Sequence, residues 1–260
     1  MTILEGKTVL VAGVGAGLGR HVVEAALRDG ANVLLAARTE AVLEQTAKEV
    51  DPSGKRVAWS RTNISDAADC QALVALGEKR FGKVDALVQV AAYELAFGGL
   101  HDADLENWRK CFETNVLGTM TLLRAVHPAM KRAGGGSIVL IGSQSMFLPS
   151  LPQAGYAASK GALLTAMYYL AQELGADNVR VNMVVPSWMW GPPVEGFLSA
   201  RAKNEKRSLD DVVQEITGKF ALRRMTEDGE VAEAAIFFCS DRAKAITGQH
   251  LLVNTGELMR

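Results

Sequence analysis

The sequence predicts an α/β fold, a Rossmann-type doubly wound parallel sheet with helices on both faces. Three observations predict it. Short apolar strands alternate with amphipathic helices along the chain, the strands are apolar throughout rather than at every second residue, and a glycine-rich turn follows the first strand. The 260 residues contain no repeat, low-complexity tract or interdomain linker. A single domain over 1–260 is therefore the simplest organisation, although the length also allows two small domains.

The predicted elements follow one another as strand, helix and strand from end to end. Runs rich in β-branched residues and bounded by glycine or polar residues predict strands, and apolar residues at helical spacing predict helices. The predicted strands cover 7–12, 32–37, 56–61, 84–91, 137–142, 179–185 and 250–253. The predicted helices cover 18–28, 40–50, 66–81, 104–132, 156–174 and 230–239.

A glycine-rich loop joins the first predicted strand to the first helix. It contains Gly13, Gly15, Gly17 and Gly19, and the helix starts at Leu18. Glycines permit a tight turn and let a pyrophosphate approach the backbone N–H groups at a helix N-terminus. The spacing departs from GxGxxG, because Leu18 stands where the last glycine would fall, and a plain glycine turn is the alternative interpretation.

Arg38 directly follows the second predicted strand, and its neighbours from Ala36 to Thr39 include no carboxylate. In a dinucleotide-binding fold a carboxylate here binds the free 2′-hydroxyl of NAD, whereas an arginine suits the 2′-phosphate of NADP. The sequence thus predicts NADP(H) as the preferred cofactor and leaves NAD(H) possible. The alternative is a solvated arginine at a helix start.

Tyr156 and Lys160 lie four residues apart on one predicted helix, and Ser143 lies at the end of the strand 137–142. Residues at this spacing share one helix face, so strand, loop and helix can bring three polar groups together. A free tyrosine, with a pKa of about 10, is a poor base at neutral pH, and a nearby ammonium lowers that pKa. Tyr-x-x-x-Lys alone occurs often by chance. With Ser143, it predicts a tyrosine that exchanges a proton with an alcohol or ketone oxygen.

Taken together, these motifs resemble those of the short-chain dehydrogenases/reductases over essentially the whole chain. Each motif is weak alone, but the combination is specific. The resemblance implies a single-domain Rossmann fold that uses NAD or NADP. The matching features are the Gly13/Gly17/Gly19 loop, Asn115-Val116-x-Gly118, Ser143 with Tyr156-x-x-x-Lys160, Ala158-Ser159-Lys160 and Thr247-Gly248-Gln249.

The resemblance implies a role for each of four polar residues. Tyr156 would be the acid/base, Ser143 would hold the substrate oxygen, and Lys160 would bind the nicotinamide ribose and lower the tyrosine pKa. Asn115 would help to hold a water that links Lys160 to solvent. A polar residue inside a helix and a strand-end cap are the alternatives for Asn115 and Ser143. The cofactor-binding residues would be Gly13, Gly17, Leu18, Gly19, Arg38, Asn63, Ala91, Tyr156, Lys160 and Pro186.

Several positions depart from the family's pattern, and they surround the cofactor rather than the reacting groups. Ala12 stands where a threonine is usual, and Asn63 where an aspartate usually meets the adenine amino group. The usual Asn-Asn-Ala-Gly is Gln89-Val90-Ala91-Ala92, and the usual Pro-Gly is Pro186-Ser187. These changes leave the reaction class in place and bear on cofactor affinity and preference.

Three aromatic residues are predicted to line the substrate pocket: Phe147, Trp188 and Trp190. Ligands of such sheets bind outside the carboxyl ends of the strands, where these residues should lie. Residues from about 187 to 225 are the predicted substrate lid, with Gly191 and Gly196 bracketing a short mobile run. Apolar walls predict a medium-sized, largely apolar substrate whose carbonyl is its main polar group.

Within the predicted lid, an apolar stripe follows a capping Ser208 and predicts one more helix. The stripe either walls the crevice, packs an ordinary helix or forms a subunit interface. It consists of Leu209, Val212, Val213 and Ile216.

Composition excludes several classes of function. The formal net charge is −1, the pI is about 6.4 and no basic tract is present, so no nucleic-acid partner is expected. No apolar run approaches the ~18 residues of a membrane helix, and the N-terminus lacks a signal-peptide pattern. We therefore expect a cytoplasmic protein with no membrane partner. The three cysteines and four histidines lack ligand spacing, so no metal site is predicted.

The sequence therefore predicts an NADP-preferring oxidoreductase, a ketoreductase that interconverts a ketone and a secondary alcohol with Tyr156 as acid/base. A catalytically inactive dinucleotide-binding sensor or scaffold is one alternative, supported only by the altered Gln89–Ala92 segment. A reductase of an imine or activated alkene on the same fold is the other. The resemblance also implies a homo-oligomer, a homotetramer, and an apolar face on 104–132 agrees with it: Leu105, Trp108, Phe112 and Val116.

Overall fold

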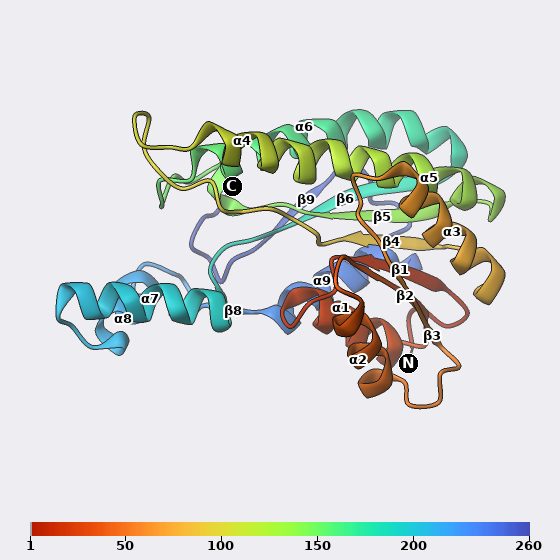
Figure 1. The fold of residues 1–260 in the computed structure, drawn as a ribbon, viewed down its shortest axis with the longest axis horizontal. Coiled ribbons are helices and arrows are strands. Elements are labelled where there is room, and N and C mark those ends of the chain that lie inside the picture. The colour runs from red at the N-terminus through yellow and green to blue at the C-terminus, as the bar shows by residue number, and fades with distance from the viewer. Residues whose placement is uncertain (1) are drawn as a thin grey trace.

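Seven parallel strands form the central sheet of the computed structural model, in which residues 2–260 are described (Figure 1). Their order is β3-β2-β1-β4-β5-β6-β9, so the chain changes direction across the sheet between β1 and β4. This confirms the predicted doubly wound parallel sheet. The strands are β1 (Thr8–Ala12), β2 (Asn32–Ala37), β3 (Val57–Arg61), β4 (Ala86–Gln89), β5 (Gly136–Ile141), β6 (Val179–Pro186) and β9 (His250–Val253).

Helices cover both faces of this sheet (Figure 1). One face carries α1 (Leu18–Arg28), α2 (Glu40–Val50) and α9 (Asp228–Cys239). The other carries α3 (Ala67–Phe81), α5 (Thr119–Arg132) and α6 (Ala154–Leu174), and α4 (Leu105–Cys111) runs beside α6. Three short 3₁₀ turns, η2 (Gln144–Met146), η3 (Gly175–Asp177) and η4 (Asp241–Ala243), complete this part of the chain. None of the helices among residues 2–260 is long and apolar enough to cross a membrane.

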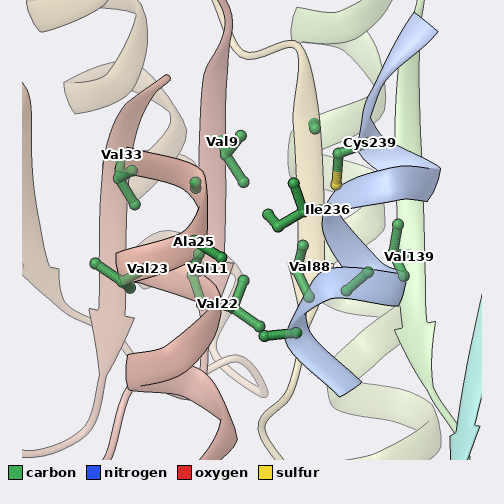
Figure 2. Close-up of a cluster of buried hydrophobic side chains, with 14 of the residues drawn as sticks. Val9, Val11, Val22, Val23, Ala25, Val33, Val88, Val139, Ile236 and Cys239 are labelled. Carbon is green, nitrogen blue, oxygen red and sulfur yellow. The ribbon is translucent and has the colours of Figure 1, made fainter. Parts of the chain in front are cut away.

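Each strand contributes side chains to both hydrophobic clusters, which explains why the strands are apolar throughout. In β1, Val9 and Val11 join the cluster under α1 and α9, whereas Leu10 and Ala12 join the cluster under α5 and α6. Figure 2 shows Val9, Val11 and Ile236 in the first cluster, between α1, the sheet and α9. Two buried faces fix the strand register, and hence the positions of the loops at the strand ends.

The predicted long helical region over 104–132 is helical from Leu105 to Arg132, but the type of helix changes in its middle. There the chain forms a π-helical turn, η1 (Phe112–Gly118), between α4 and α5. A π-turn adds a residue to the helix repeat and often occurs at functional sites. Asn115 lies inside it and Gly118 at its end, where a Cβ atom would come 2.9 Å from the Ser65 hydroxyl.

Residues 187–225, called here the α7–α8 segment, have a small core of their own at one end of the sheet (left in Figure 1). The segment contains α7 (Pro192–Glu205) and α8 (Leu209–Thr217). Its ends meet where β7 (Met189–Trp190) pairs with β8 (Thr226–Glu227). The core consists of Leu198, Ala202, Val212, Phe220 and Met225.

Two predictions about this segment have different outcomes. Ser208 caps α8 by accepting a 3.1 Å hydrogen bond from Asp211 N–H, as predicted. The prediction that Gly191 and Gly196 bracket a mobile run is wrong, because Gly196 lies inside α7. Proline is tolerated in the first turn of a helix, so Pro192 starts α7 rather than breaking it.

Candidate active site

The glycine loop between β1 and α1 contains two glycines that packing requires. Gly13 has a φ of 101°, and a Cβ atom there would come 2.3 Å from the Ala91 nitrogen. A Cβ atom on Gly19 would come 2.3 Å from the Gly13 carbonyl oxygen. These contacts hold the loop against β4 and bring the start of α1 to the carboxyl ends of the strands.

The start of α1 fits an anionic group. Gly17 is its N-cap and offers no side-chain cap, and the first turn contains no acidic residue. A Cβ atom on Gly15 would meet no atom within 4 Å, so the backbone there is open to a ligand. The 11-residue helix therefore presents backbone N–H groups of the kind that bind a pyrophosphate.

One carboxylate lies near this anion-binding loop. An Asp228 oxygen is 3.2 Å from the position that a Cβ atom on Gly17 would take. Burial raises the pKa of Asp228, with a smaller opposing effect from His21.

The other residues predicted to bind the cofactor lie at the strand ends around this loop. Arg38 is exposed immediately after β2, and its side chain makes no hydrogen bond or ion pair with any residue from 2 to 260. Asn63, also exposed, accepts a 3.2 Å hydrogen bond from Ser65 N–H through its side chain. Ala91 donates its N–H to the Ala12 carbonyl at 2.9 Å, and Pro186 is buried at the end of β6.

Ser143, Tyr156 and Lys160 meet at the carboxyl end of β5. Lys160 is buried, and its ammonium donates a 2.7 Å hydrogen bond to the Ile141 carbonyl, the last residue of β5. The same nitrogen lies 5.7 Å from the centroid of the Tyr156 ring. Ser143 follows two residues after Ile141, and its hydroxyl is 2.9 Å from that of Ser145. The structure therefore brings together the three groups that the sequence placed on a strand end and a helix face.

The expected lowering of the Tyr156 pKa is wrong for this arrangement. Burial raises the pKa of Tyr156, and the negative charge of Glu94 raises it further. A hydrogen bond with the Ser143 hydroxyl acts in the opposite direction and is the smaller effect. The phenol is consequently protonated at neutral pH and available to donate a proton.

Burial lowers the pKa of Lys160 to about 8, and the charge of Glu94 limits that shift. Lys160 is therefore mostly an ammonium at neutral pH, but it loses its proton at a lower pH than an exposed lysine does.

Among residues 2–260, no group of three or more potential metal-binding side chains is present.

Asn115 ties the segment after β4 to the helix that carries Tyr156. Its side-chain oxygen accepts a hydrogen bond from Tyr93 N–H at 2.7 Å, and its amide donates to the Tyr93 carbonyl at 2.9 Å. The same amide donates to the Ser159 hydroxyl at 2.9 Å, and Ser159 donates to the Tyr156 carbonyl at 2.7 Å. These bonds run from β4 to α6 beneath the reacting groups.

Gln89 extends this network where the sequence departs from the family's pattern. Its amide donates hydrogen bonds to the Ala91 carbonyl at 3.2 Å and to the Thr119 hydroxyl at 3.0 Å. Thr119 in turn donates to the Asn115 carbonyl at 2.8 Å. Gln89 thus supports the segment after β4 and the π-turn at the same time.

Sequence reasoning missed four residues around the site: Tyr93, Glu94, Thr119 and Asp228. Thr119 is four residues after Asn115, the spacing at which a hydroxyl can bond a helix carbonyl, so that signal was available. Tyr93 and Glu94 follow the unusual Gln89–Ala92 run, and Asp228 starts α9. Only tertiary structure brings these three to the site.

The aromatic residues predicted to line the substrate pocket lie in two places. Trp188 packs with the α7–α8 core, its ring centroid 6.2 Å from that of Phe197, and Trp190 is 38% exposed. Phe147 instead contacts the β9 side: its ring centroid lies 5.5 Å from that of His250 and 4.1 Å from the Arg260 guanidinium. The structure therefore does not bring the three predicted pocket residues together: the two tryptophans lie at the α7–α8 segment and Phe147 lies at β9.

Comparisons with known proteins agree with this geometry. A family model described as "Enoyl-(Acyl carrier protein) reductase" matches residues 13–257. "Dehydrogenase/reductase SDR family member 4" of Bos taurus is 32% identical, over 98% of this chain and 88% of the relative. "2-(S)-hydroxypropyl-CoM dehydrogenase 3" of Xanthobacter autotrophicus is 29% identical, over 97% of each chain.

Solved structures of known proteins also resemble this chain over nearly its whole length. NAD⁺-bound xylitol dehydrogenase superposes with a TM-score of 0.90 at 25% identity, covering 97% of this chain and 99% of the other. A variant of the actinorhodin polyketide ketoreductase with NADPH has a TM-score of 0.88 at 28% identity, covering 96% of this chain and 97% of the other. The similarity extends over the sheet, both helix layers and the α7–α8 segment.

Proposed function

The chain belongs to the short-chain dehydrogenase/reductase family of NAD(P)-dependent enzymes that act on alcohol or carbonyl groups, and we propose that it is an NADP-preferring oxidoreductase that interconverts a ketone and a secondary alcohol. The observation that carries this proposal is the meeting of Ser143, Tyr156 and Lys160 beside the end of β5, at the same carboxyl edge of the sheet as the glycine loop. Relatives named for NAD⁺ and for NADPH support the nicotinamide cofactor without choosing between them.

In the proposed mechanism, the residues of this chain bind the ketone and supply the proton. The bound cofactor supplies the hydride. The Ser143 hydroxyl donates a hydrogen bond to the carbonyl oxygen and stabilises the negative charge that develops there. Tyr156, whose pKa is raised, donates its phenolic proton to the same oxygen. The Lys160 ammonium, 5.7 Å from the centroid of the Tyr156 ring, would then favour the phenolate that remains, and it would contact the nicotinamide ribose of the bound cofactor.

Asn115 is a positioning residue in this proposal. Its hydrogen bonds to Tyr93 and Ser159 hold the segment after β4 and the backbone at Tyr156 in one arrangement. The cofactor would contact Gly13, Gly17, Leu18 and Gly19 through its phosphates, and Asn63, Ala91 and Pro186 along its rings and riboses.

Arg38 supports the NADP preference, because its exposed guanidinium stands after β2 with no carboxylate beside it to bind a ribose hydroxyl. We expect Arg38→Asp to shift the ratio of kcat/KM for NADPH over NADH by about tenfold or more toward NADH. Arg124→Asp, the same charge change at an exposed arginine of α5, is the matched control and should leave the ratio unchanged. A wild-type preference for NADH would contradict the assignment.

The α7–α8 segment is the proposed substrate lid. Both of its ends pass through the short β7–β8 pair, and its helices pack on a core separate from the sheet clusters. Its last residues are also bonded to the C-terminal turn, for example from Leu222 N–H to the Thr255 carbonyl at 3.0 Å, so α7 and α8 are the part that would move and exclude water on closing. Trp188 and Trp190 would then contact an apolar part of a small-molecule substrate.

We also propose that the protein is a homo-oligomer, and the family resemblance implies a homotetramer. Large apolar side chains are exposed on α4, η1 and α6, namely Leu105 (63%), Phe112 (37%), Leu117 (55%) and Tyr169 (75%). An exposed apolar surface of this kind is typical of a subunit interface. Light scattering at micromolar concentration should show a species several times 27.8 kDa, and a purely monomeric sample would contradict the proposal. A cytoplasmic location is proposed with it.

The function is tested by incubating the purified protein with NADPH or NADH and a panel of ketones, and following nicotinamide absorbance. Turnover of ketones supports the proposal. Cofactor binding without turnover of any ketone would favour a sensor or scaffold. The panel also includes an imine and an enoyl thioester, because the matching family model is described as an enoyl reductase. Turnover of the enoyl thioester alone would replace the ketone assignment.

A further inference from the structure

Glu94 is the one carboxylate whose charge acts on both Tyr156 and Lys160 among residues 2–260, and the mechanism above gives it no task. It raises the pKa of the phenol and opposes the lowering of the ammonium pKa. Its side chain is exposed and makes no hydrogen bond or ion pair with any described residue. Glu94 directly follows Tyr93, which Asn115 binds through both backbone groups, so a free negative charge lies one residue from the network that holds the helix of Tyr156.

The backbone around Glu94 is fixed rather than loose. Tyr93, the preceding residue, is bound by Asn115 through both its N–H and its carbonyl, and its phenol donates to the Asn107 side chain at 2.6 Å. The Glu94 carbonyl accepts a hydrogen bond from Ala96 N–H at 2.9 Å. The backbone that carries this carboxylate is thus held by the network that also holds the catalytic helix.

The far end of this loop is also tied to the helix of Tyr156. Gly98 N–H donates to the Pro152 carbonyl at 2.9 Å, and Gly98 pairs with Gln153, the N-cap of α6. Between the two ties, Leu95 is 56% exposed and Phe97 is 44% exposed. The loop 93–98 therefore borders the site with two apolar side chains and one carboxylate.

We propose that Glu94 is a specificity-determining residue that binds a positively charged group of the substrate, so that the preferred ketones carry an ammonium group near the carbonyl. This inference rests on the ketone reductase proposed above. It adds one charged contact to a pocket that Trp188 and Trp190 otherwise make apolar.

A cation suits this position better than a neutral hydroxyl does. In the free protein the Glu94 charge opposes formation of the Tyr156 phenolate, the species left after proton donation. A substrate ammonium paired with Glu94 would cancel that opposition when the substrate binds, whereas a hydroxyl would leave the negative charge in place. Binding of the preferred substrate would then favour transfer of the Tyr156 proton to the substrate's carbonyl oxygen.

The test compares an aminoketone with the ketone in which a methyl group replaces the ammonium. Wild type should favour the aminoketone in kcat/KM by about tenfold, the size of a partly exposed charge pair. Glu94→Gln should abolish this preference and turn over the neutral ketone at least as fast as wild type, because the charge that opposes the Tyr156 phenolate is gone. Turnover of the neutral ketone also shows that the variant is folded. Glu106→Gln, an equal loss of charge on α4 facing Arg109, should keep the preference.

Two further measurements, a pH profile and calorimetry, separate this inference from a merely structural role of Glu94. The limb of the pH profile that reports Lys160, near pH 8, should move to lower pH in Glu94→Gln, because a negative charge that raises its pKa is gone. A merely structural residue would not move it. The binding of the two ketones is measured by calorimetry in parallel, so that the charge preference is tested even without turnover.

Equal binding of the two ketones by wild type, or an unchanged preference in Glu94→Gln, would overturn the inference. A hydroxyketone that binds as well as the aminoketone and depends equally on Glu94 would also overturn it, in favour of hydroxyl recognition. Binding preference without turnover of any ketone would instead contradict the proposed reaction and leave the charge recognition standing.

Discussion

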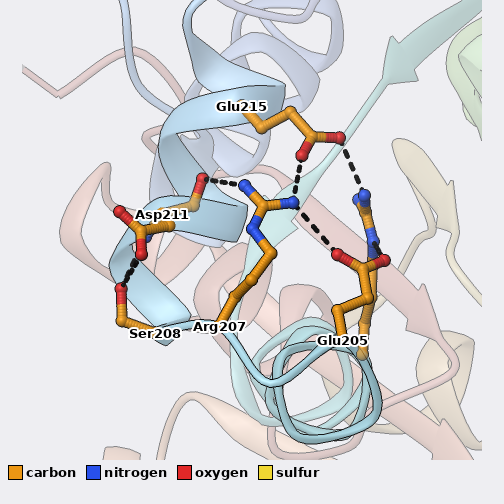
Figure 3. A network of polar contacts seen from close by, with 6 residues as sticks. Glu205, Arg207, Ser208, Asp211 and Glu215 are labelled. Atoms are coloured by element: carbon orange, nitrogen blue, oxygen red, sulfur yellow. Dashed lines mark hydrogen bonds and ion pairs between the residues drawn. The ribbon is translucent and has the colours of Figure 1, made fainter.

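Ionisable groups are buried at the catalytic end of β5, whereas in the α7–α8 segment they form exposed ion pairs. At β5, burial moves both pKa values toward the neutral forms: the Tyr156 pKa rises and the Lys160 pKa falls to about 8. In the α7–α8 segment, Arg201 and Arg207 bond the exposed Glu215 carboxylate and lower its pKa to about 2 (Figure 3). At the end of β5, burial costs free energy for the charged forms. In the α7–α8 segment, the charged groups form ion pairs that are exposed to water.

This difference indicates a division of work between the two regions. Side chains at β5 are held by buried hydrogen bonds to the main chain, such as that from Lys160 to the Ile141 carbonyl, which salt does not screen. Exposed ion pairs such as Arg201–Glu205 are worth little and weaken with salt. This contrast agrees with the proposal that the first region keeps the geometry of the reaction and that α7 and α8 of the second move and select the substrate.

The largest expected effect lies at the reacting groups. Tyr156→Phe removes the donated proton and keeps the ring, so turnover should fall by about 10²- to 10⁴-fold. NADPH binding, measured by fluorescence, should change little. Substantial remaining turnover would show that another group moves the proton and would remove the chemistry from this end of β5.

A smaller effect tests whether the catalytic region buries a charge at a cost. The folded-state pKa of Lys160, about 8, lies below the ordinary value of 10.5. Between these values the unfolded chain binds more protons, so the contribution of Lys160 to stability rises with pH through this window. Lys160→Met lacks the ammonium, so its free energy of unfolding lacks this rise with pH. The free energy of unfolding of wild type relative to Lys160→Met should therefore increase by about 2 kcal/mol from pH 8 to pH 10.

Urea unfolding at several pH values measures this difference. Lys79→Met, which removes an exposed lysine of α3, should give a curve parallel to that of wild type. A Lys160→Met curve that also runs parallel to wild type would mean that the ammonium is not buried at a cost, and the contrast between the two regions would lose its basis.

The sheet and its helices were predictable from sequence because two buried faces demand continuous apolar strands. Strand 32–37 and helices 18–28 and 40–50 have their predicted bounds. The α7 helix was not predicted, because Pro192, Pro193 and Gly196 are poor helix formers by themselves. The buried contacts of Leu198 and Ala202 stabilise it instead, and these depend on tertiary structure.

The candidate site was predictable where residues share one element or a strand end, as with Tyr156, Lys160 and Ser143. It was not predictable where residues far apart in sequence meet. The bond between Asn115 and Ser159 spans 44 positions and depends on a π-turn that no periodicity announces. The Tyr156 pKa was mispredicted for the same reason, because its burial and the nearness of Glu94 are properties of the folded chain.

The division of work is tested most directly by the ratio of kcat/KM for a bulky apolar ketone over a small one, measured for Ser143→Ala and Trp188→Ala. Ser143→Ala should lower kcat/KM for both ketones by about 10²- to 10³-fold, because the carbonyl oxygen is common to both, and the ratio should stay that of wild type. Trp188→Ala should lower the ratio by about tenfold or more, because only the bulky ketone loses apolar contact. A changed ratio in Ser143→Ala, or equal losses on both ketones in Trp188→Ala, would contradict the account.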